Sequence, residues 1–169
     1  MYRPSTYNAH NESMNAFAKM FNDCELFPNI VMKPKEIEDY ECDGYFVNVN
    51  TGEQIGYDWE IRDKYFKNGH FEFPTLGQYE RKIKKADIEL SLQSDSTKTA
   101  VAVAWHNDFK NSDVLNRSLS TDTKYKQSGK TRETKKFWII KHEDIAILKQ
   151  ILHIAFETGN RSYDGTNPL

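Results

Sequence analysis

The chain has 169 residues, of which 38% are hydrophobic and 28% charged, and its 23 Lys and Arg against 25 Asp and Glu give a formal net charge of −2. This near-neutral balance excludes a protein that coats nucleic acid through bulk positive charge, so any such binding must come from local patches. Ten Phe, nine Tyr and three Trp argue against disorder, although the mean hydropathy is −0.77. The apolar runs are far shorter than the ~18–20 residues of a transmembrane helix. We therefore expect one intracellular, cytoplasmic domain over residues 1–169 that does not enter a membrane.

The first half of the chain predicts a helix and a hairpin. Apolar residues recur at helical spacing from Met14 to Cys24, which predicts a helix over residues 10–27. An acidic stretch follows at residues 36–43. Residues 44–62 predict a β-hairpin, with GYFVNV and IGYDWEI as its strands and Asn-Thr-Gly-Glu as its turn.

The second half predicts further strands and a closing helix. Residues 86–105 predict two strands, because apolar and polar residues alternate before the run TAVAVAW. Residues 107–136 show no apolar period and predict a long basic loop, whereas residues 137–140 predict a short strand. Residues 143–158 predict an amphipathic helix that ends at Gly159. The elements together predict an α/β (α+β) fold with a single mixed β-sheet of about five strands flanked by helices.

The predicted hairpin brings three carboxylates together. Alternation along its second strand puts Asp58, Glu60 and Arg62 on one face. Because the two strands run antiparallel, Asp43 at the start of the first lies toward the end of the second. Clustered carboxylates repel one another unless a cation or a proton offsets their charge, and carboxylate oxygens suit Mg²⁺ or Mn²⁺. The pattern therefore predicts a divalent metal held by Asp43, Asp58 and Glu60, which would activate water and stabilise a phosphodiester oxyanion.

This arrangement resembles the PD-(D/E)XK nuclease superfamily. Its members carry an acidic residue at the start of one strand and (D/E)-x-K on the next strand of a hairpin. Asp43 matches the first acid, and residues 58–62 match the second motif in either of two registers. In one register Asp58 is the acid and Glu60 replaces the lysine; in the other Glu60 is the acid and Arg62 stands in for the lysine. The resemblance implies a restriction-endonuclease-like core.

The resemblance also implies catalytic residues outside the hairpin. Many members use a glutamate from the first helix, and Glu12 is placed for that role. Because the motif lacks its lysine, Lys82 or Lys84 could supply the charge from elsewhere.

Other polar residues follow on the next predicted strands. Asp87 and Glu89 share one strand face and offer a lesser register of the same motif, with Asp58 as its first acid. Gln93 lies further along that face and would stand near the metal. His106 ends the next strand and is either a proton carrier or a surface residue.

Two basic segments would hold the phosphate backbone of a nucleic acid. One follows the hairpin, and the other lies in the long predicted loop. Basic side chains on an adaptable backbone contact phosphates and position a nucleic acid without reading its sequence. The residues predicted to make these contacts are Lys84, Lys85, Lys124, Lys126, Lys130, Arg132, Lys135 and Lys136.

The sequence thus predicts a Mg²⁺-dependent endonuclease that hydrolyses DNA phosphodiester bonds. A homodimer would be needed to cut both strands in concert with one site per chain, and the small size would suit a phage or mobile-element protein. The predicted catalytic residues are Asp43, Asp58, Glu60, Arg62, Glu12 and Lys82.

The alternative is a non-catalytic binding or inhibitor protein. Its acidic stretch at residues 36–43 and the hairpin face would meet a basic partner protein. Aromatic residues anchor many such interfaces, and Tyr40, Tyr45, Tyr57 and Trp59 would serve here.

Overall fold

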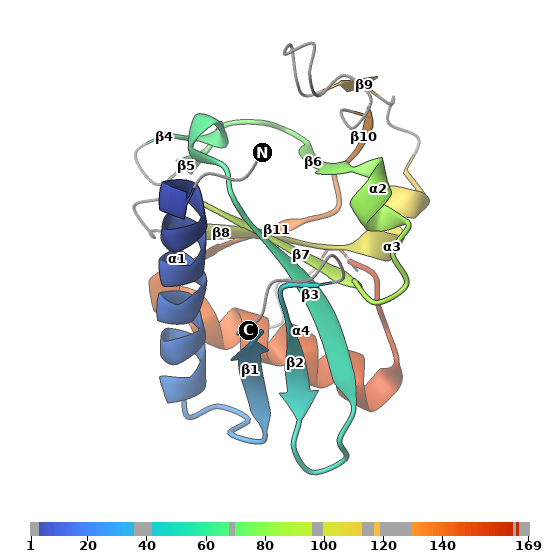
Figure 1. Ribbon diagram of the computed structural model, residues 1–169. Helices are drawn as coiled ribbons and strands as arrows, with labels where there is room; N and C mark the ends of the chain where they lie inside the picture. The colour runs from blue at the N-terminus through green and yellow to red at the C-terminus, as the bar shows by residue number, and fades with distance from the viewer. Residues whose placement is uncertain are drawn as a thin grey trace.

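The computed structural model describes residues 4–35, 42–67, 70–95, 100–112, 117–118, 130–163 and 165 (Figure 1). Its centre is a six-stranded sheet in the order β1-β2-β3-β7-β8-β11. The strands are β1 Ile30–Pro34, β2 Gly44–Asn48, β3 Gln54–Ile61, β7 Leu90–Ser94, β8 Ala100–Trp105 and β11 Trp138–Lys141. Strands β3 and β7 pair in parallel, whereas the other neighbouring pairs are antiparallel. The main sheet is therefore mixed, as expected, with one strand more than the predicted five.

The remaining elements lie on the two faces of this sheet. The described residues form four α-helices: α1 Pro4–Asp23, α2 Glu80–Ile83, α3 His106–Lys110 and α4 Ile145–Thr158. Two short 3₁₀ turns are η1 Asp63–Tyr65 and η3 His142–Asp144. A second sheet has the order β6-β10-β9, with β6 Leu76–Tyr79, β10 Lys130–Thr134 and β9 Arg117–Ser118. A two-stranded ribbon joins β4 Phe66–Lys67 to β5 His70–Phe71.

One face of the central sheet is apolar and is covered by α1 and α4. Its core cluster includes Phe17 and Phe21 of α1, Trp59 of β3, and Leu148 and Leu152 of α4, each at most 3% exposed. These residues recur at a helical period along α1 and α4 and at a period of two along β3. Each large apolar side chain buried in this way contributes roughly 1.5–3 kcal/mol. This face therefore supplies most of the apolar burial that stabilises the fold.

The opposite face is covered by α2, α3 and β6. Strand β8 explains how these elements fit, because its sequence AVAVAW alternates small and larger residues. Val101 and Val103 join the core beneath α1 and α4, whereas Ala102 and Ala104 join a smaller cluster with Leu76 of β6. Small side chains on this face let the covering elements approach the sheet closely. The same face carries the buried polar side chains described below.

Gly56 of β3 is required by a close crossing of the chain. The peptide oxygen of Asp87 lies only 1.8 Å from where a Cβ at position 56 would stand. The amide of Glu89 also donates to the Gly56 carbonyl at 2.9 Å. The segment before β7 therefore lies directly against β3, and an alanine at position 56 would displace it.

Several predicted boundaries differ from the structure. Helix α1 begins at Pro4 and ends at Asp23, so it lies earlier than the expected 10–27. Strand β1 was not predicted: its residues, Ile30–Pro34, lie between the helix expected over 10–27 and the acidic stretch at 36–43 and had no assignment. The expected strand over 86–93 begins only at Leu90, since residues 86–89 cross over β3.

The long loop expected over 107–136 contains helix α3 and strands β9 and β10 instead. Strand β10 was missed because its sequence, KTRET, has no apolar residue that would reveal a strand period, although Thr131 and Glu133 are buried. The predicted hairpin is confirmed as β2 and β3, and α4 confirms the closing helix from Ile145 to Thr158.

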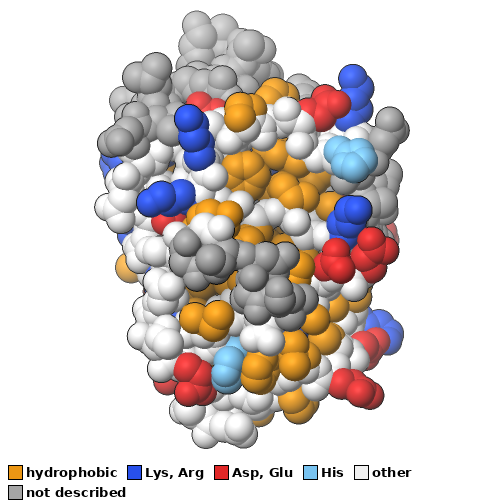
Figure 2. Space-filling view, turned by 180° about the vertical axis from the view of Figure 1, so that it is seen from behind, with side chains coloured by type: hydrophobic (Ala, Val, Ile, Leu, Met, Phe, Trp, Pro, Cys, Tyr) orange, Lys and Arg blue, Asp and Glu red, His pale blue; other side chains and the backbone are white. Residues whose placement is uncertain are grey.

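The surface seen from behind Figure 1 carries hydrophobic side chains gathered toward its middle, with acidic and basic side chains mostly at its margins (Figure 2). Within the part of the chain that the structure describes, none of the helices has the length and apolar character needed to cross a membrane.

Candidate active site

Strand β3 turns two carboxylates toward the polar face of the sheet. Tyr57 and Trp59 point into the apolar core, so the alternating residues Asp58 and Glu60 point to the opposite face. Asp58 is only 5% exposed. A buried carboxylate needs a charged or hydrogen-bonding partner, because its transfer from water is costly.

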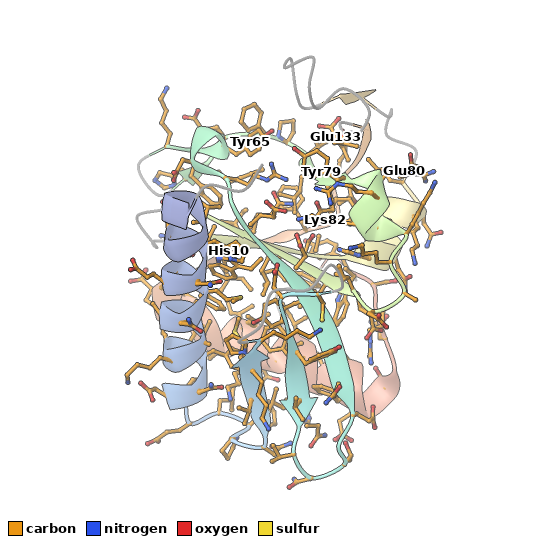
Figure 3. All side chains as sticks on the ribbon, in the orientation of Figure 1. His10, Tyr65, Tyr79, Glu80, Lys82 and Glu133 are labelled. Atoms are coloured by element: carbon orange, nitrogen blue, oxygen red, sulfur yellow. The ribbon has the colours of Figure 1, made fainter. Side chains whose placement is uncertain are left out.

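Lys82 of α2 is that partner, and it contacts both carboxylates. Its Nζ donates to Asp58 Oδ1 at 2.9 Å and to Oδ2 at 3.2 Å, and it also pairs with Glu60 Oε1. Burial opposes ionisation of Asp58, but the charge and hydrogen bond of Lys82 outweigh it and hold the pKa of the carboxyl below its usual range. Lys82 points from α2 toward the sheet (Figure 3). The structure therefore holds two carboxylates and one ammonium in direct contact.

Gln78, Ser91 and His106 extend this group into the protein. Gln78 of β6 donates from Nε2 to Asp58 Oδ2 at 3.2 Å and to Ser91 Oγ. Ser91 lies beside Asp58 in the parallel pairing of β3 and β7, and its Oγ is 3.3 Å from His106 Nε2. Burial lowers the pKa of His106 to about 4, although the charge of Asp58 favours protonation. His106 is therefore neutral at pH 7, and its Nε2 can accept a hydrogen bond from the Ser91 hydroxyl.

Arg62 and Gln93 border the same group. Arg62 Nη2 lies 3.8 Å from Glu60 Oε2, and its guanidinium stands 5.2 Å from the centre of the Tyr79 ring. Gln93 lies beside Glu60 in the pairing of β3 with β7 and donates to the Gly77 carbonyl at 2.8 Å. The carboxylate pair is thus surrounded by two cations and several neutral hydrogen-bonding groups.

Asp43 lies at the edge of β3 rather than beside Lys82. Its Oδ2 accepts the backbone N–H of Trp59 at 2.7 Å and stands 3.8 Å from His10 Nε2 on α1. His10 Nε2 is also 2.7 Å from the Trp59 carbonyl oxygen. Burial opposes protonation of His10, but its interaction with Asp43 outweighs this and raises the pKa of the imidazole. Asp43 and His10 therefore bracket the backbone between Asp58 and Glu60.

Not every predicted site residue joins this group. Glu12 is exposed on α1, where His10 takes the place next to the sheet. Asp87 is exposed, and Glu89 pairs with Arg161 at 3.2 Å. His106 was predicted to be either a proton carrier or a surface residue. It is only 1% exposed, so it is not a surface residue.

The predicted phosphate-binding residues are only partly described. Lys84, Lys135 and Lys136 are exposed, and Lys85 is half-buried. Arg132 pairs with Glu80 at 3.3 Å. Lys130 begins β10, whereas Lys124 and Lys126 lie outside the described residues.

For the alternative function, a binding protein, two of the four aromatic residues predicted to anchor a partner are wrong. Tyr57 and Trp59 are 0% and 1% exposed, so they cannot anchor a partner. Tyr45 is half-buried, whereas Tyr40 and residues 36–41 of the acidic stretch lie outside the described residues.

The three predicted metal ligands do not form a single preformed coordination site. In the described ranges, no three His, Cys, Asp or Glu side chains are grouped so that they could hold a metal ion. Asp58 and Glu60 form a pair, while Asp43 bonds to the backbone beside them. The ligation of a metal by all three carboxylates stays a prediction.

Gln78 and Ser91 were missed by the sequence reasoning. Gln78 lies in a Phe- and Gly-rich connection with no strand period, and only the β6–β10 pairing fixes its direction. Ser91 alternates with the apolar residues Leu90 and Leu92, but alternation does not indicate whether the polar face of a strand is buried, and Ser91 is 0% exposed.

Comparison of the chain with protein-family models, curated proteins and solved structures found no match.

Proposed function

We propose that the protein is a metal-dependent nuclease that hydrolyses phosphodiester bonds in DNA. The observation that carries this proposal is the contact of the Lys82 ammonium with the two carboxylates Asp58 and Glu60 on one strand face. Two acids and a lysine are the groups that the resemblance to the PD-(D/E)XK superfamily requires. The lysine comes from α2, not from the strand itself.

The position of the group in the fold supports a restriction-endonuclease-like core. Asp43 immediately precedes β2, and Asp58 and Glu60 lie near the end of β3, its antiparallel partner. The bond from the Trp59 amide to Asp43 brings the first acid next to the second motif. This is the relation between the two motifs that the resemblance implies.

The residues present fit a hard divalent cation. Carboxylate oxygens are the ligands that Mg²⁺ and Mn²⁺ prefer, and Mg²⁺ commonly takes only one or two carboxylates beside water and phosphate. Asp58 and Glu60 would hold the ion, while Asp43 bonds to the backbone of Trp59 between them. When bound, such an ion supplies an activated water and stabilises negative charge on the phosphate.

The protein's own groups divide the remaining work. Lys82 offsets part of the negative charge of Asp58 and Glu60, so the two acids can stay close. The same ammonium can hold a phosphate oxygen when the carboxylates bind a cation. Gln78, fixed between Asp58 and Ser91, orients the Asp58 carboxylate, and neutral His106 fixes Ser91 in turn. These bonds position the acids before substrate arrives.

The direct test is cleavage of plasmid DNA with Mg²⁺ or Mn²⁺ by the wild-type protein and three variants. We expect Asp58→Asn and Glu60→Gln to abolish cleavage. We expect Lys82→Met to slow it about 10²–10³-fold, as loss of one charge-stabilising donor does in other enzymes. Thermal unfolding of each variant shows whether it is folded.

Lys19→Met is the matched control. Lys19 is an exposed lysine of α1 with no predicted role in the site, and its side chain is 77% exposed and pairs with Asp23 at 2.8 Å. We expect this variant to cleave DNA at the wild-type rate. Wild-type protein that cleaves neither duplex nor single-stranded DNA with either metal overturns the proposal, as does cleavage that survives both carboxylate variants.

A further inference from the structure

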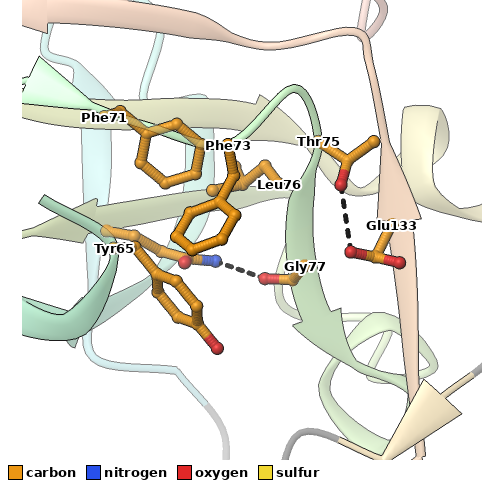
Figure 4. A pocket seen from close by; sticks show the side chains of 8 residues that line it. Tyr65, Phe71, Phe73, Thr75, Leu76, Gly77 and Glu133 are labelled. Carbon is orange, nitrogen blue, oxygen red and sulfur yellow. Dashed lines mark hydrogen bonds between the residues drawn. The ribbon is translucent and has the colours of Figure 1, made fainter.

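A small pocket lined by aromatic rings lies beside β6 (Figure 4). The rings of Tyr65, Phe71 and Phe73 form one wall, and Thr75, Gln93 and Glu133 add polar groups. The enclosed space is only about 10 Å³, which is room for one water molecule. A larger group can therefore lie only against the open mouth of the pocket, on the exposed rings.

The pocket and the candidate active site share two strands. On β6, Gly77 lines the pocket, and the next residue, Gln78, donates to Asp58. On β7, Gln93 lines the pocket and lies beside Glu60 of β3. The pocket mouth is therefore lined by residues that adjoin partners of Asp58 and Glu60 along the two strands.

Arg62 links the pocket to the site. It precedes η1, whose last residue is Tyr65, and the Tyr65 amide donates to the Arg62 carbonyl at 3.0 Å. The Arg62 side chain is 13% exposed, and its buried Nε and Nη2 have no hydrogen-bond partner among the described residues. Buried guanidinium donors without acceptors fit a ligand that brings its own oxygens, such as a phosphate.

We propose that an unpaired nucleobase stacks on the aromatic wall at the mouth of this pocket while Arg62 holds an adjoining phosphate, so that single-stranded nucleic acid is the preferred substrate. This inference rests on the proposed nuclease function. A base inside a duplex cannot reach a pocket of this kind unless it leaves the stack, whereas a single strand offers its bases freely. Positive charge from Arg62 and Lys82 beside an aromatic wall is the combination that such strands need.

Phe73 is the residue best placed to stack on the base. It is 42% exposed, among the most exposed large apolar side chains of the described residues. Its ring meets Tyr65 edge to face, with centroids 5.3 Å apart and an interplanar angle of 83°. It meets Phe71 in the same way at 6.0 Å. These rings do not stack face to face on one another, so an incoming ring can add to the wall.

Fluorescence anisotropy in EDTA tests the inference without cleavage. The probes are labelled 12-nucleotide single strands of DNA and of RNA, and a blunt DNA duplex of the same sequence. We expect a single strand to bind more tightly than the duplex, and the DNA and RNA arms show which sugar is preferred. Stacking is worth ~1–3 kcal/mol per base by alanine substitution, so Phe73→Ala should weaken single-strand binding about 5- to 150-fold.

Two further variants separate stacking from a general loss of apolar surface. Phe73→Leu keeps an apolar side chain but removes the ring, and we expect it to weaken binding almost as much as alanine. Ile139→Ala removes a comparably exposed apolar residue, 40% exposed on β11, and should leave binding unchanged. Arg62→Met should weaken binding and flatten its dependence on salt.

The outcomes distinguish this inference from the proposed function. Equal binding by Phe73→Ala and the wild type, tighter binding of the blunt duplex, or no binding of any probe overturns the pocket assignment. An effect of Phe73→Ala on dimer formation in sedimentation, without an effect on single-strand affinity, overturns it as well. Single-strand binding that depends on Phe73, in a protein that cleaves nothing with either metal, supports the pocket and overturns the nuclease.

Discussion

The two faces of β3 carry opposite kinds of side chain within a few residues of each other. Tyr57 and Trp59 lie in the apolar core beneath α1 and α4, and both are at most 1% exposed. Asp58, between them, is 5% exposed on the other face, where it meets Lys82 and Gln78. Asp58 is therefore almost as deeply buried as its two neighbours, but the free energy of burial has the opposite sign on the two faces. The apolar side gains from leaving water, whereas the polar side loses hydration that its partners must replace.

The difference indicates what each face is for. A buried ion pair is weak evidence for stability, because well-packed apolar residues of similar volume often do as well or better. The polar face is also built from several elements, since β3, β6, β7, α2 and α3 each supply at least one member. Apolar burial on one side thus supports a polar group on the other that the fold itself does not need.

The strongest test of this comparison is Trp59→Ala. The substitution removes a large ring that packs on Phe17 at 5.1 Å between centroids and loses the bond from Nε1 to Ser13 Oγ. We expect the free energy of unfolding to fall by about 3–5 kcal/mol. Urea unfolding followed by circular dichroism measures it.

Trp138→Ala is the matched control for Trp59. Trp138 is only half-buried and packs its ring against Tyr163 at 4.6 Å. We expect a clearly smaller loss of stability. Equal losses of stability in the two variants would mean that packing beneath α1 contributes no more to the free energy of unfolding than packing at the sheet edge.

The polar face should make the stability of the protein depend on pH. The pKa of His106 is lowered to about 4, so between pH 6.5 and 4 the unfolded chain binds a proton that the folded chain does not. Stability is therefore lost as pH falls, by about 2 kcal/mol at pH 5 and about 3 kcal/mol near pH 4. Asp58, Lys82 and Lys110 are the charged groups that act on this imidazole.

His106→Gln isolates that contribution. Urea unfolding of both proteins at pH 7.5 and pH 5 gives two differences, and the variant should lose about 2 kcal/mol less than the wild type. Only the change with pH matters, so the substitution's own effect on packing cancels. Parallel pH profiles would show that His106 is not held neutral by the fold.

The sequence predicted the hairpin, the closing helix and the pair Asp58 and Glu60, because each depends on local periodicity. Lys82 was predicted as a source of charge, but its direction comes from α2, a four-residue helix with no apolar period of its own. His10 was missed for a similar reason, since α1 begins before the expected position and turns His10, not Glu12, toward β3. Partners that tertiary packing brings together leave little trace in local sequence.

Gln78 tests the neutral part of the polar group. Gln78→Leu keeps the volume but leaves Asp58 and Ser91 without their shared donor. We expect a loss of about 1–2 kcal/mol, because Lys82 still compensates the Asp58 charge. Asn111→Ala, an exposed position after α3, is the control and should change stability very little. If Gln78→Leu leaves the free energy of unfolding unchanged, Lys82 alone is enough to compensate the buried Asp58 carboxylate.

The smallest expected effect decides whether Asp43 belongs to the polar site or only to the sheet edge. Because the pKa of His10 is raised by Asp43, the stability it contributes is present below pH 6.5 and is lost as pH rises through the folded pKa. His10→Gln should therefore cost about 0.5–1 kcal/mol at pH 6 and less at pH 8.5. NMR titration of the His10 ring with and without Mg²⁺ adds the decisive observation. If Asp43 binds the cation together with Asp58 and Glu60, its charge is no longer available to His10 and the His10 pKa must fall toward its ordinary value. An unchanged His10 titration, in protein whose Asp58→Asn variant has lost a Mg²⁺-induced rise in Tm, would leave Asp43 as an anchor of the β3 backbone and confine the metal to the two carboxylates beside Lys82.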